Sequence, residues 1–359
     1  MKHFNLINRH VRALFLPALI ATISLSSSCK KETVDNPDPV PSASLSDANM
    51  SSFAPALPGV KTKYKIVAPI NLYNKSNVTI SYDSIAGGST ACIQLINCTN
   101  VHITHCRLGN SKSFGILIGN SSNILVDSCY ISKTATGILA LSCPKGMIRI
   151  QYNQLQNMQG PFPQGASIQF SGVGGPYNRV QFNKIQNVVG QSHPEDAISI
   201  YKSNGLATDP ICVINNNVQG GGPSTTGTGI ILGDGGGSNQ TAQNNSVVNS
   251  GAMGMQVAGG THIQISNNKI YSAAFAWSHM GLGCGNYSGA PSNNITISGN
   301  QVNWLSGNPK DQINGAKTRV MNSSYQAGTP MPIGWLTNVL GAAINTSIIP
   351  VPLLNFNLF

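Results

Sequence analysis

The sequence predicts an all-β solenoid in which about nine to ten short coils stack on one another. One observation is a repeat with a fixed polar position. The other is a composition rich in Asn, Gly and Ser, in which only 9% of the residues are charged. Apolar residues still make up 41% of the 359-residue chain, which is too many for an intrinsically disordered protein.

The repeat is visible in the segments 70–85, 93–108 and 116–131, whose loop residues Asn77, Asn100 and Asn123 fall 23 residues apart. A second polar position recurs in nine places: Asp83, Cys106, Cys129, Asn153, Asn183, Asn216, Asn245, Asn268 and Asn300. Two residues after each of them lies Ile, Leu or Val. This regularity indicates short strands with one buried face, joined by tight bends.

An asparagine at such a bend can adopt the left-handed conformation and bond to the equivalent asparagine of the next coil, which predicts an asparagine ladder. With this pattern, residues 64 to 305 resemble the right-handed parallel β-helix of the pectate-lyase-like superfamily, built from PbH1-type repeats. The resemblance implies a right-handed solenoid and a polysaccharide groove bordered by long loops.

The chain divides into four predicted regions. Residues 1–28 combine a basic start with an apolar run, residues 13–25, that is too short to span a bilayer as a helix. They resemble a bacterial lipoprotein signal with Cys29 as the lipidation site, so we expect export and a lipid anchor in the outer membrane, on its periplasmic or cell-surface side. Ordinary secretion is the alternative. Residues 29–60 are predicted to be a flexible tether, 61–305 the β-helix and 306–359 a C-terminal cap.

The charge of the chain favours acidic partners. Without residues 1–28, which hold Lys2, Arg9 and Arg12, 18 basic and 11 acidic residues remain, a formal charge of +7. Such a charge attracts anionic polysaccharides or a membrane surface. A nucleic-acid partner is not expected, because there is no basic patch or nucleic-acid-binding motif. We expect a monomer.

The cysteines predict neither a zinc site nor a complete disulfide framework. Seven remain besides Cys29, and none forms a C-x-x-C pair. Cys106 and Cys129 occupy the same slot of adjacent coils, where stacked side chains point the wrong way for a disulfide, so we expect buried thiols. No metal site and no cofactor are predicted, and calcium lacks a stack of acidic ligands to hold it.

From residue 155 onward, one loop of each coil lengthens, at 156–165, 186–196, 219–229 and 271–281. Insertions at one position of consecutive coils build a wall, which is commonly the binding face of a repeat protein. Strand alternation places Ile168, Phe170, Ile198, Ile200, Ile230 and Leu232 inside. The predicted substrate-binding residues in the loops and on the outward positions are Phe162, Gln164, Ser167, Gln169, Ser199, Asp234 and Trp277. The aromatic residues among them have an alternative role, which is to pin the loops to the body.

The segment 190–205 concentrates the side chains that could do chemistry. We predict His193 or Tyr201 as base and acid, Lys202 as the cation that neutralises a substrate carboxylate, and Glu195 and Asp196 as orienting groups. Asp196 is expected to bond to loop amides, and counting along the strands places Lys202 beside Asp234 as an ion pair. His102 and His262 lie on other strands and are expected to face water without a role.

Two short motifs in this segment resemble those of known enzymes. "EDAISI" (195–200) resembles the paired aspartates of polygalacturonases, although the His-Gly and Arg-Ile-Lys signatures of that family are missing. "HPED" (193–196) is similar, in shuffled order, to the Asp-Pro-His-Asp motif of alginate epimerases, so no residue roles can be transferred.

The resulting hypothesis is a β-helix that binds polysaccharide and acts on uronate-containing glycans, with a lyase or epimerase favoured over a glycoside hydrolase. Proton abstraction next to a uronate carboxyl needs a base, an acid and a cation, and the segment offers these residue types. The alternative is a non-catalytic surface adhesin or structural β-helix, in which the polar loops are simply solvated.

Overall fold

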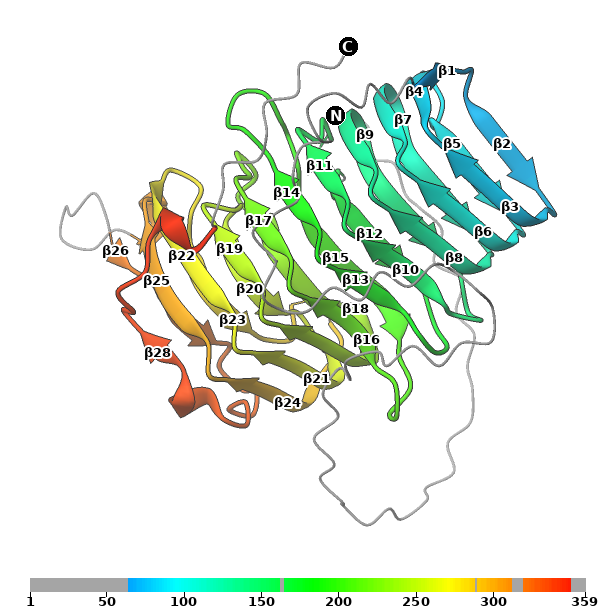
Figure 1. Cartoon of the computed structure of the whole chain (residues 1–359). Helices are drawn as coiled ribbons and strands as arrows, with labels where there is room; N and C mark the ends of the chain where they lie inside the picture. Colours follow the sequence, from blue (N-terminus) through cyan, green and yellow to red (C-terminus); the bar gives the residue numbers. More distant parts are fainter. Residues whose placement is uncertain (1–63, 162–164, 288, 312–318, 350–359) are drawn as a thin grey trace, which may run out of the picture.

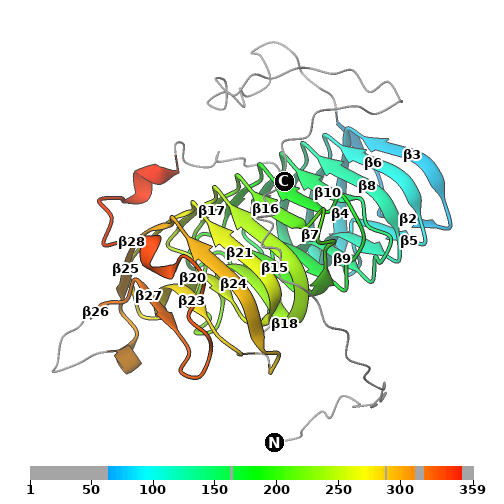
Figure 2. The same cartoon turned by 90° about the horizontal axis from the view of Figure 1, so that it is seen from below.

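A computed structural model describes residues 64–161, 165–287, 289–311 and 319–349 and shows a solenoid of parallel strands (Figures 1 and 2). Each coil runs along a first face, a second face and a third face and then starts the next coil. Each strand pairs with the equivalent strand of the following coil, so the predicted stack of parallel coils is confirmed. The predictions for residues 1–60, including the lipidation site Cys29, lie outside the described residues.

The first face stacks ten strands among the described residues, in agreement with the predicted number of coils. They are β2 (Ile70–Tyr73), β5 (Ile93–Ile96), β7 (Arg107–Gly119), β9 (Tyr130–Leu141), β12 (Ile168–Ser171), β15 (Ile198–Asn204), β18 (Thr228–Gln243), β20 (Met253–Val257), β23 (Met280–Cys284) and β27 (Ser323–Tyr325). Strands β7, β9 and β18 are long because each continues around a corner and serves two faces.

The other two faces are built in the same way. The second face contains part of β18 together with β3 (Ser76–Ser81), β6 (Thr99–Thr104), β8 (Ser122–Asp127), β10 (Ile148–Gln151), β13 (Arg179–Gln181), β16 (Ile211–Ile214), β21 (Gly260–Ser266) and β24 (Ser292–Ser298). The third face contains parts of β7 and β9 together with β1 (Lys65–Ile66), β4 (Asp83–Gly88), β11 (Gln154–Gln156), β14 (Lys184–Gln186), β17 (Asn217–Gln219), β19 (Ser246–Val248), β22 (Lys269–Phe275), β25 (Gln301–Ser306) and β28 (Val339–Leu340).

The core is the column of side chains that the three faces enclose. All six residues predicted to point inward have no exposed surface: Ile168, Phe170, Ile198, Ile200, Ile230 and Leu232. Each such side chain contributes roughly 1.5–3 kcal/mol through its removal from water. The stacked coils therefore form one continuous core, as the repeat predicted.

The asparagine ladder lies at the corner between the second and third faces, and it is buried. The side-chain Oδ1 of Asn183 accepts hydrogen bonds from both the backbone N–H (3.0 Å) and the side-chain Nδ2 (3.1 Å) of Asn153. Asn183 makes the same pair of bonds to Asn216, and the pattern continues through Asn245 and Asn268 to Asn300. Each step satisfies buried polar groups that would otherwise be costly.

The prediction gave the left-handed backbone conformation to the ladder asparagine, and the structure has it there in an exposed ladder but not in the buried one. In the exposed ladder of Asn77, Asn100 and Asn123, the asparagines themselves have φ between 52° and 58°. In the buried ladder the residue before each asparagine takes this conformation, as Tyr152 and Phe182 do with φ near 57°. The asparagine can then turn its side chain into the solenoid, because the bend has already been made by its neighbour.

Cys106 and Cys129 continue the buried ladder toward the N-terminus. The backbone N–H of Cys106 donates to Sγ of Cys129 (3.4 Å), and that of Cys129 donates to Oδ1 of Asn153 (3.0 Å). Both thiols are free and buried, as predicted. A thiol can thus replace the amide as acceptor in this slot.

After β25 the chain returns to the last coils. Strand β26 (Arg319–Val320) runs antiparallel to β25, whereas β27 and β28 pair in parallel with β23 and β25. Three short 3-10 helices, η2 (Pro309–Asp311), η3 (Trp335–Thr337) and η4 (Thr346–Ile348), complete the described part. Asn338 accepts from Asn300 and so extends the ladder one step beyond the predicted repeat. The cap over 306–359 stays a prediction as a whole. In the described parts of the chain, no helix is long and apolar enough to cross a membrane.

Replacing one ladder asparagine should strongly destabilise the fold. We expect Asn183→Ala to lower the free energy of unfolding by about 3–5 kcal/mol, because it leaves the N–H of Asn153 buried without an acceptor and removes the side-chain bond to the carbonyl of Ile150. Urea unfolding monitored by circular dichroism measures the change.

The matched control is Asn293→Ala, which changes an exposed strand asparagine and should cost less than about 0.5 kcal/mol. Equal losses in the two variants would show that the ladder does not stabilise the solenoid beyond an ordinary surface side chain.

Candidate functional site

A groove of about 960 Å³ lies at the corner where the third face leads into the first face. We call this corner the loop corner, because the long loops after β11, β14 and β17 also lie there. The groove is lined by short turns of the early coils and by the first two long loops: Gly88, Ser89, Asn110, Ser111, Lys112, Lys133, Ala135, Asn157, Gln159, Gly160, Pro161 and Gln191. It therefore lies where the coil corner begins to widen.

The two long loops are joined by side-chain amides. Asn157 donates through Nδ2 to Oε1 of Gln191 (3.2 Å), and Gln159 donates through Nε2 to the backbone carbonyl of Gln191 (2.9 Å). The backbone N–H of His193 donates to the carbonyl of Met158 (2.9 Å). These bonds hold the two loops together as one wall of the groove.

The groove is positively charged. Lys112 and Lys133 have exposed side chains on consecutive coils, and no acidic residue is among the described lining residues. The amides of Asn110, Asn157 and Gln159 add neutral donors and acceptors. Cations with amides around them suit a ligand that carries both hydroxyl groups and negative charge. Neither lysine was predicted, since both lie where β7 and β9 continue around the corner, outside the long loops.

The carboxylates of the predicted catalytic segment are held by the next coil. Ser224 and Thr226 donate their hydroxyls to the two oxygens of Glu195 (2.5 Å each), and the backbone N–H of Thr228 donates to Asp196 Oδ1 (2.8 Å). Asp196 therefore bonds to a backbone amide, as expected, but to that of the first residue of β18 and not to a loop amide. Burial raises the pKa of Asp196 well above its usual range, and the charges of Glu195 and, less strongly, Asp234 raise it further.

Tyr201 and Lys202 lie farther along β15. At about 3.3 Å per residue, Tyr201 is roughly 16 Å from Asp196 along the strand. The register partner of Asp234 is Tyr201, not Lys202 as predicted, because the pairing of β15 with β18 shifts by a residue between Ser199 and Tyr201. Lys202 is exposed and its Nζ lies 5.0 Å from the ring centre of Tyr201. A hydrogen bond to Tyr201 is the main cause that raises the pKa of Lys202, with the charge of Asp234 a smaller one.

The structure therefore separates the predicted cluster into two parts. Glu195 and Asp196 lie before the start of β15, and His193 is an exposed residue of the same loop. Tyr201 and Lys202 lie in the second half of the strand. The acid pair remains a candidate for acid–base chemistry, while a direct partnership with Lys202 is not seen.

Among the predicted substrate-binding residues, Ser167 is placed wrongly. It is fully buried, and its Oγ accepts a bond from Nδ2 of the buried Asn187 (3.4 Å), so it faces the interior. Ser199 is 1% exposed, and its Oγ has no hydrogen-bond partner among the described residues. Gln169, its register partner, is half-buried. Phe162 and Gln164 lie outside the described residues.

Trp277 holds a loop in place, in line with the alternative role for the aromatic residues. Its ring stacks on Phe275, with 5.0 Å between ring centres, and it lies so close to Gly222 that a Cβ there would be 2.3 Å from Cε2 of the indole. Gly222 has φ of +77°. The ring thus fixes the loop after β17, and only a glycine fits beneath it.

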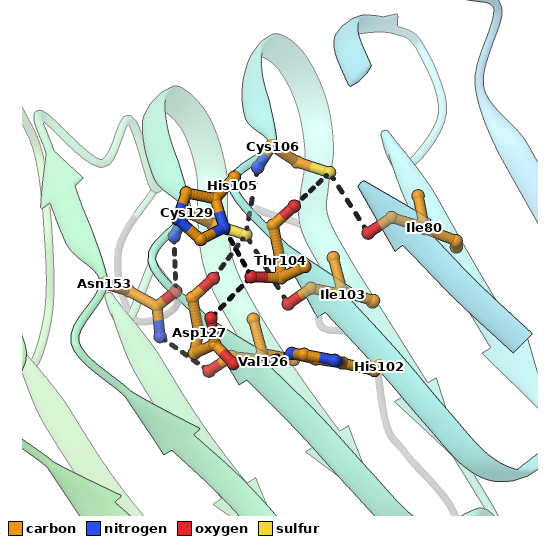
Figure 3. Close-up of polar contacts among 10 residues, drawn as sticks. All are labelled: Ile80, His102, Ile103, Thr104, His105, Cys106, Val126, Asp127, Cys129 and Asn153. Carbon is orange, nitrogen blue, oxygen red and sulfur yellow. Dashed lines mark hydrogen bonds and ion pairs between the residues drawn. The ribbon is translucent and has the colours of Figure 1, made fainter. Parts of the chain in front are cut away.

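A second polar cluster, on the outer side of the second face, was not predicted (Figure 3). Nε2 of His102 lies 2.6 Å from Oδ2 of Asp127, and Thr104 donates its hydroxyl to Oδ1 of the same carboxylate (2.6 Å). Thr104 Oγ1 also lies 2.7 Å from Nδ1 of His105. His102 therefore lies on the solvent side of the sheet, as expected, but its imidazole is paired with Asp127. The available signal was that Thr104 and Asp127 occupy the same strand slot, 23 residues apart.

In the described parts of the chain, no three His, Cys, Asp or Glu side chains come together as metal ligands. The carboxylates of Glu195, Asp196 and Asp127 bond instead to hydroxyls, a backbone amide and imidazole.

Comparison with known proteins bears on the fold. The model of the family described as "Right handed beta helix region" matches residues 68–237. A crystal structure of PfbA, a surface adhesin of Streptococcus pneumoniae, is similar over 70% of each chain with 14% identity and a TM-score of 0.41. Among curated proteins, none matches the sequence. With the parallel strand register described above, the family match shows that this chain is a right-handed parallel β-helix.

Proposed function

We propose that this chain binds an acidic polysaccharide in the groove of the loop corner. The observation that carries the proposal is the lining of that groove, which combines Lys112 and Lys133 with side-chain amides and has no carboxylate among its described residues. An extended polymer with repeated negative charges fits a groove that crosses several coils. The formal charge of the chain favours the same partner through long-range attraction.

The location proposed for this activity is the cell envelope. The apolar run 13–25 followed by Cys29 supports export and a lipid anchor, with residues 29–60 as the tether. An anchored β-helix would hold a captured polymer close to the membrane. Metabolic labelling with a palmitate analogue tests this part, since Cys29→Ala should abolish incorporation.

Removing the two groove lysines should weaken binding of an acidic polymer. We expect Lys112→Ala/Lys133→Ala to reduce the affinity for polygalacturonate about tenfold, because two charge interactions of up to about 1 kcal/mol each are lost. Isothermal titration calorimetry at low ionic strength measures this, with neutral dextran as the ligand that should not bind.

The matched control is Lys75→Ala/Lys145→Ala, which removes two exposed lysines at another corner of the solenoid. Salt should weaken binding to the wild-type protein. If both double variants lose the same affinity, or if polygalacturonate does not bind at all, the groove is not the binding site.

A second candidate function is acid–base catalysis on the bound polymer at Glu195 and Asp196. The specific observation is that these adjacent carboxylates differ in environment, and the raised pKa of Asp196 favours a protonated acid that can donate. Ser224 and Thr226 hold Glu195 in one orientation. A lyase or epimerase would need a proton acceptor and donor of this kind, and a hydrolase would need two carboxyl groups.

If catalysis occurs there, Asp196→Asn should lower turnover of uronate polymers at least a hundredfold, the usual contribution of general acid–base catalysis. The absorbance of unsaturated products and the release of reducing ends report lyase and hydrolase activity, and NMR reports epimerisation. Asp83→Asn, at the far end of the solenoid, is the matched control. Unchanged turnover in Asp196→Asn would remove this site and leave the binding proposal intact.

The raised pKa of Asp196 also predicts a pH dependence of stability. In the unfolded chain this carboxyl ionises near pH 4, whereas in the folded protein it keeps its proton to a higher pH, so its contribution to stability falls as pH rises above about 4. Asp196→Asn cannot ionise and keeps an acceptor for Thr228. We expect the variant to gain stability relative to the wild type between pH 4 and pH 7 in thermal unfolding. A constant difference across this range would contradict the shift.

A further inference from the structure

The outer side of the second face carries an arginine without a counter-charge. Arg149 on β10 is half-buried, and its guanidinium has no hydrogen-bond, ion-pair or ring partner among the residues the structure describes. Its register partners are Leu125 on β8 and Arg179 on β13. A second arginine one coil away makes this an unfavourable place for an uncompensated positive charge.

On the β8 side of Arg149, the nearest carboxylate in the strand register already has two hydrogen-bond partners. Asp127 is the register partner of Gln151, two residues after Arg149. One of its oxygens bonds to His102 and the other to Thr104, as Figure 3 shows. Burial would raise the pKa of Asp127, but the bonds from His102 and Thr104 outweigh it and lower the pKa, so the carboxylate stays ionised. Its charge is therefore directed to His102, away from Arg149.

On the β13 side of Arg149, the nearby carboxylate also has two hydrogen-bond partners. Asp209 accepts from Nη2 of the buried Arg179 (2.5 Å) and, through its second oxygen, from the backbone N–H of Tyr177 (2.7 Å). Arg179 further donates to the carbonyls of Asn178 and Pro210. This pair is complete by itself, and it keeps Arg179 from competing for an external anion.

A second donor lies next to Arg149. The side-chain oxygen of Gln151 accepts from Nε2 of Gln181 (2.9 Å), which leaves the Nε2 of Gln151 without a partner among the described residues. Arg149 and Gln151 are two residues apart on one strand, so their side chains leave the same side of the sheet. Together they offer the planar guanidinium fork and one amide donor.

We propose that Arg149, with Gln151 beside it, is an oxyanion-binding subsite on the outer side of the second face. The substrate class rests on the proposed function: the ligand is a carboxylate or sulfate group of an acidic glycan, which a guanidinium binds in a bidentate manner. His102 and Thr104 act as positioning residues, since they hold Asp127 away from Arg149. The subsite is separate from the lysine groove of the loop corner.

The direct test observes the Nε–Hε resonance of Arg149 by NMR while digalacturonate, or inorganic sulfate, is added to the full chain. We expect a saturable shift of this resonance in the wild type. In Arg149→Lys, which keeps the charge but loses the fork, we expect about tenfold weaker binding, followed through the side-chain Nε2 resonances of Gln151. A response to sulfate as well as to digalacturonate would identify a general oxyanion site, and a response to digalacturonate alone a carboxylate site. Lys75→Ala is the control that removes an unrelated exposed charge.

Thr104→Val tests the positioning role. Without the hydroxyl, one oxygen of Asp127 loses its partner and becomes available to Arg149, which is a diagonal neighbour within reach of a long side chain. We expect the Arg149 resonance of this variant to shift before any ligand is added and the affinity to fall about tenfold. A loss of affinity without this initial shift would limit the role of Thr104 to structure.

The outcomes separate this subsite from the groove. If digalacturonate shifts resonances of Lys112 and Lys133 but leaves Arg149 unmoved, the subsite is wrong and the proposed function stands. If neither set moves with digalacturonate or with polygalacturonate, both fail. If only Arg149 moves, the subsite stands and the binding site proposed at the loop corner is wrong.

Discussion

The hydrogen bond from one ladder asparagine to the next is the interaction on which the rest of this structure depends. From Asn183 onward, each side-chain oxygen receives two donors from the preceding coil, and each side-chain nitrogen donates both forward to the next amide and back to a backbone carbonyl. A buried polar chain of this kind is tolerated only when every member is satisfied. It also fixes the register, because a slip by one residue would leave the amides unpaired and turn the core side chains outward.

Fixed register also organises the surface. With every coil aligned, insertions at one corner accumulate in one place, and the loops after β11 and β14 bond to each other as a wall. The same alignment stacks outward side chains in columns. Thr104 meets Asp127 and Arg149 meets Arg179 only because equivalent positions are register partners. The lysine groove and the Asp127 cluster are therefore products of one stacking rule.

The repeat made the fold and the core predictable from sequence. The polar position and the apolar residue two places after it recur in every coil, which predicted the ladder. Strand alternation predicted the six buried strand residues. The corners were less predictable, because alternation breaks there. Ser167 and Ile168 are neighbours, and yet both face the interior, which placed Ser167 wrongly.

The candidate sites depended on contacts that the strand pattern does not encode. Because the strand register shifts by one residue between Ser199 and Tyr201, Asp234 pairs with Tyr201 and not with Lys202. Lys112 and Lys133 lie where β7 and β9 continue around the corner, and only the packing of the first long loop against those strands creates a groove. His102 lies diagonally opposite Asp127 on the adjacent coil. A pattern of acidic residues at equivalent positions of consecutive coils therefore could not predict this pair.

Native-state hydrogen exchange of the ladder amides tests most directly whether the ladder holds the coils together. The backbone N–H groups of Asn153, Asn183 and Asn216 donate to side-chain oxygens of the next coil. If the ladder holds the register, these amides exchange only when the whole solenoid unfolds, and all with the same free energy. Exchange as fast as that of an exposed loop residue such as Gly190 would contradict the account.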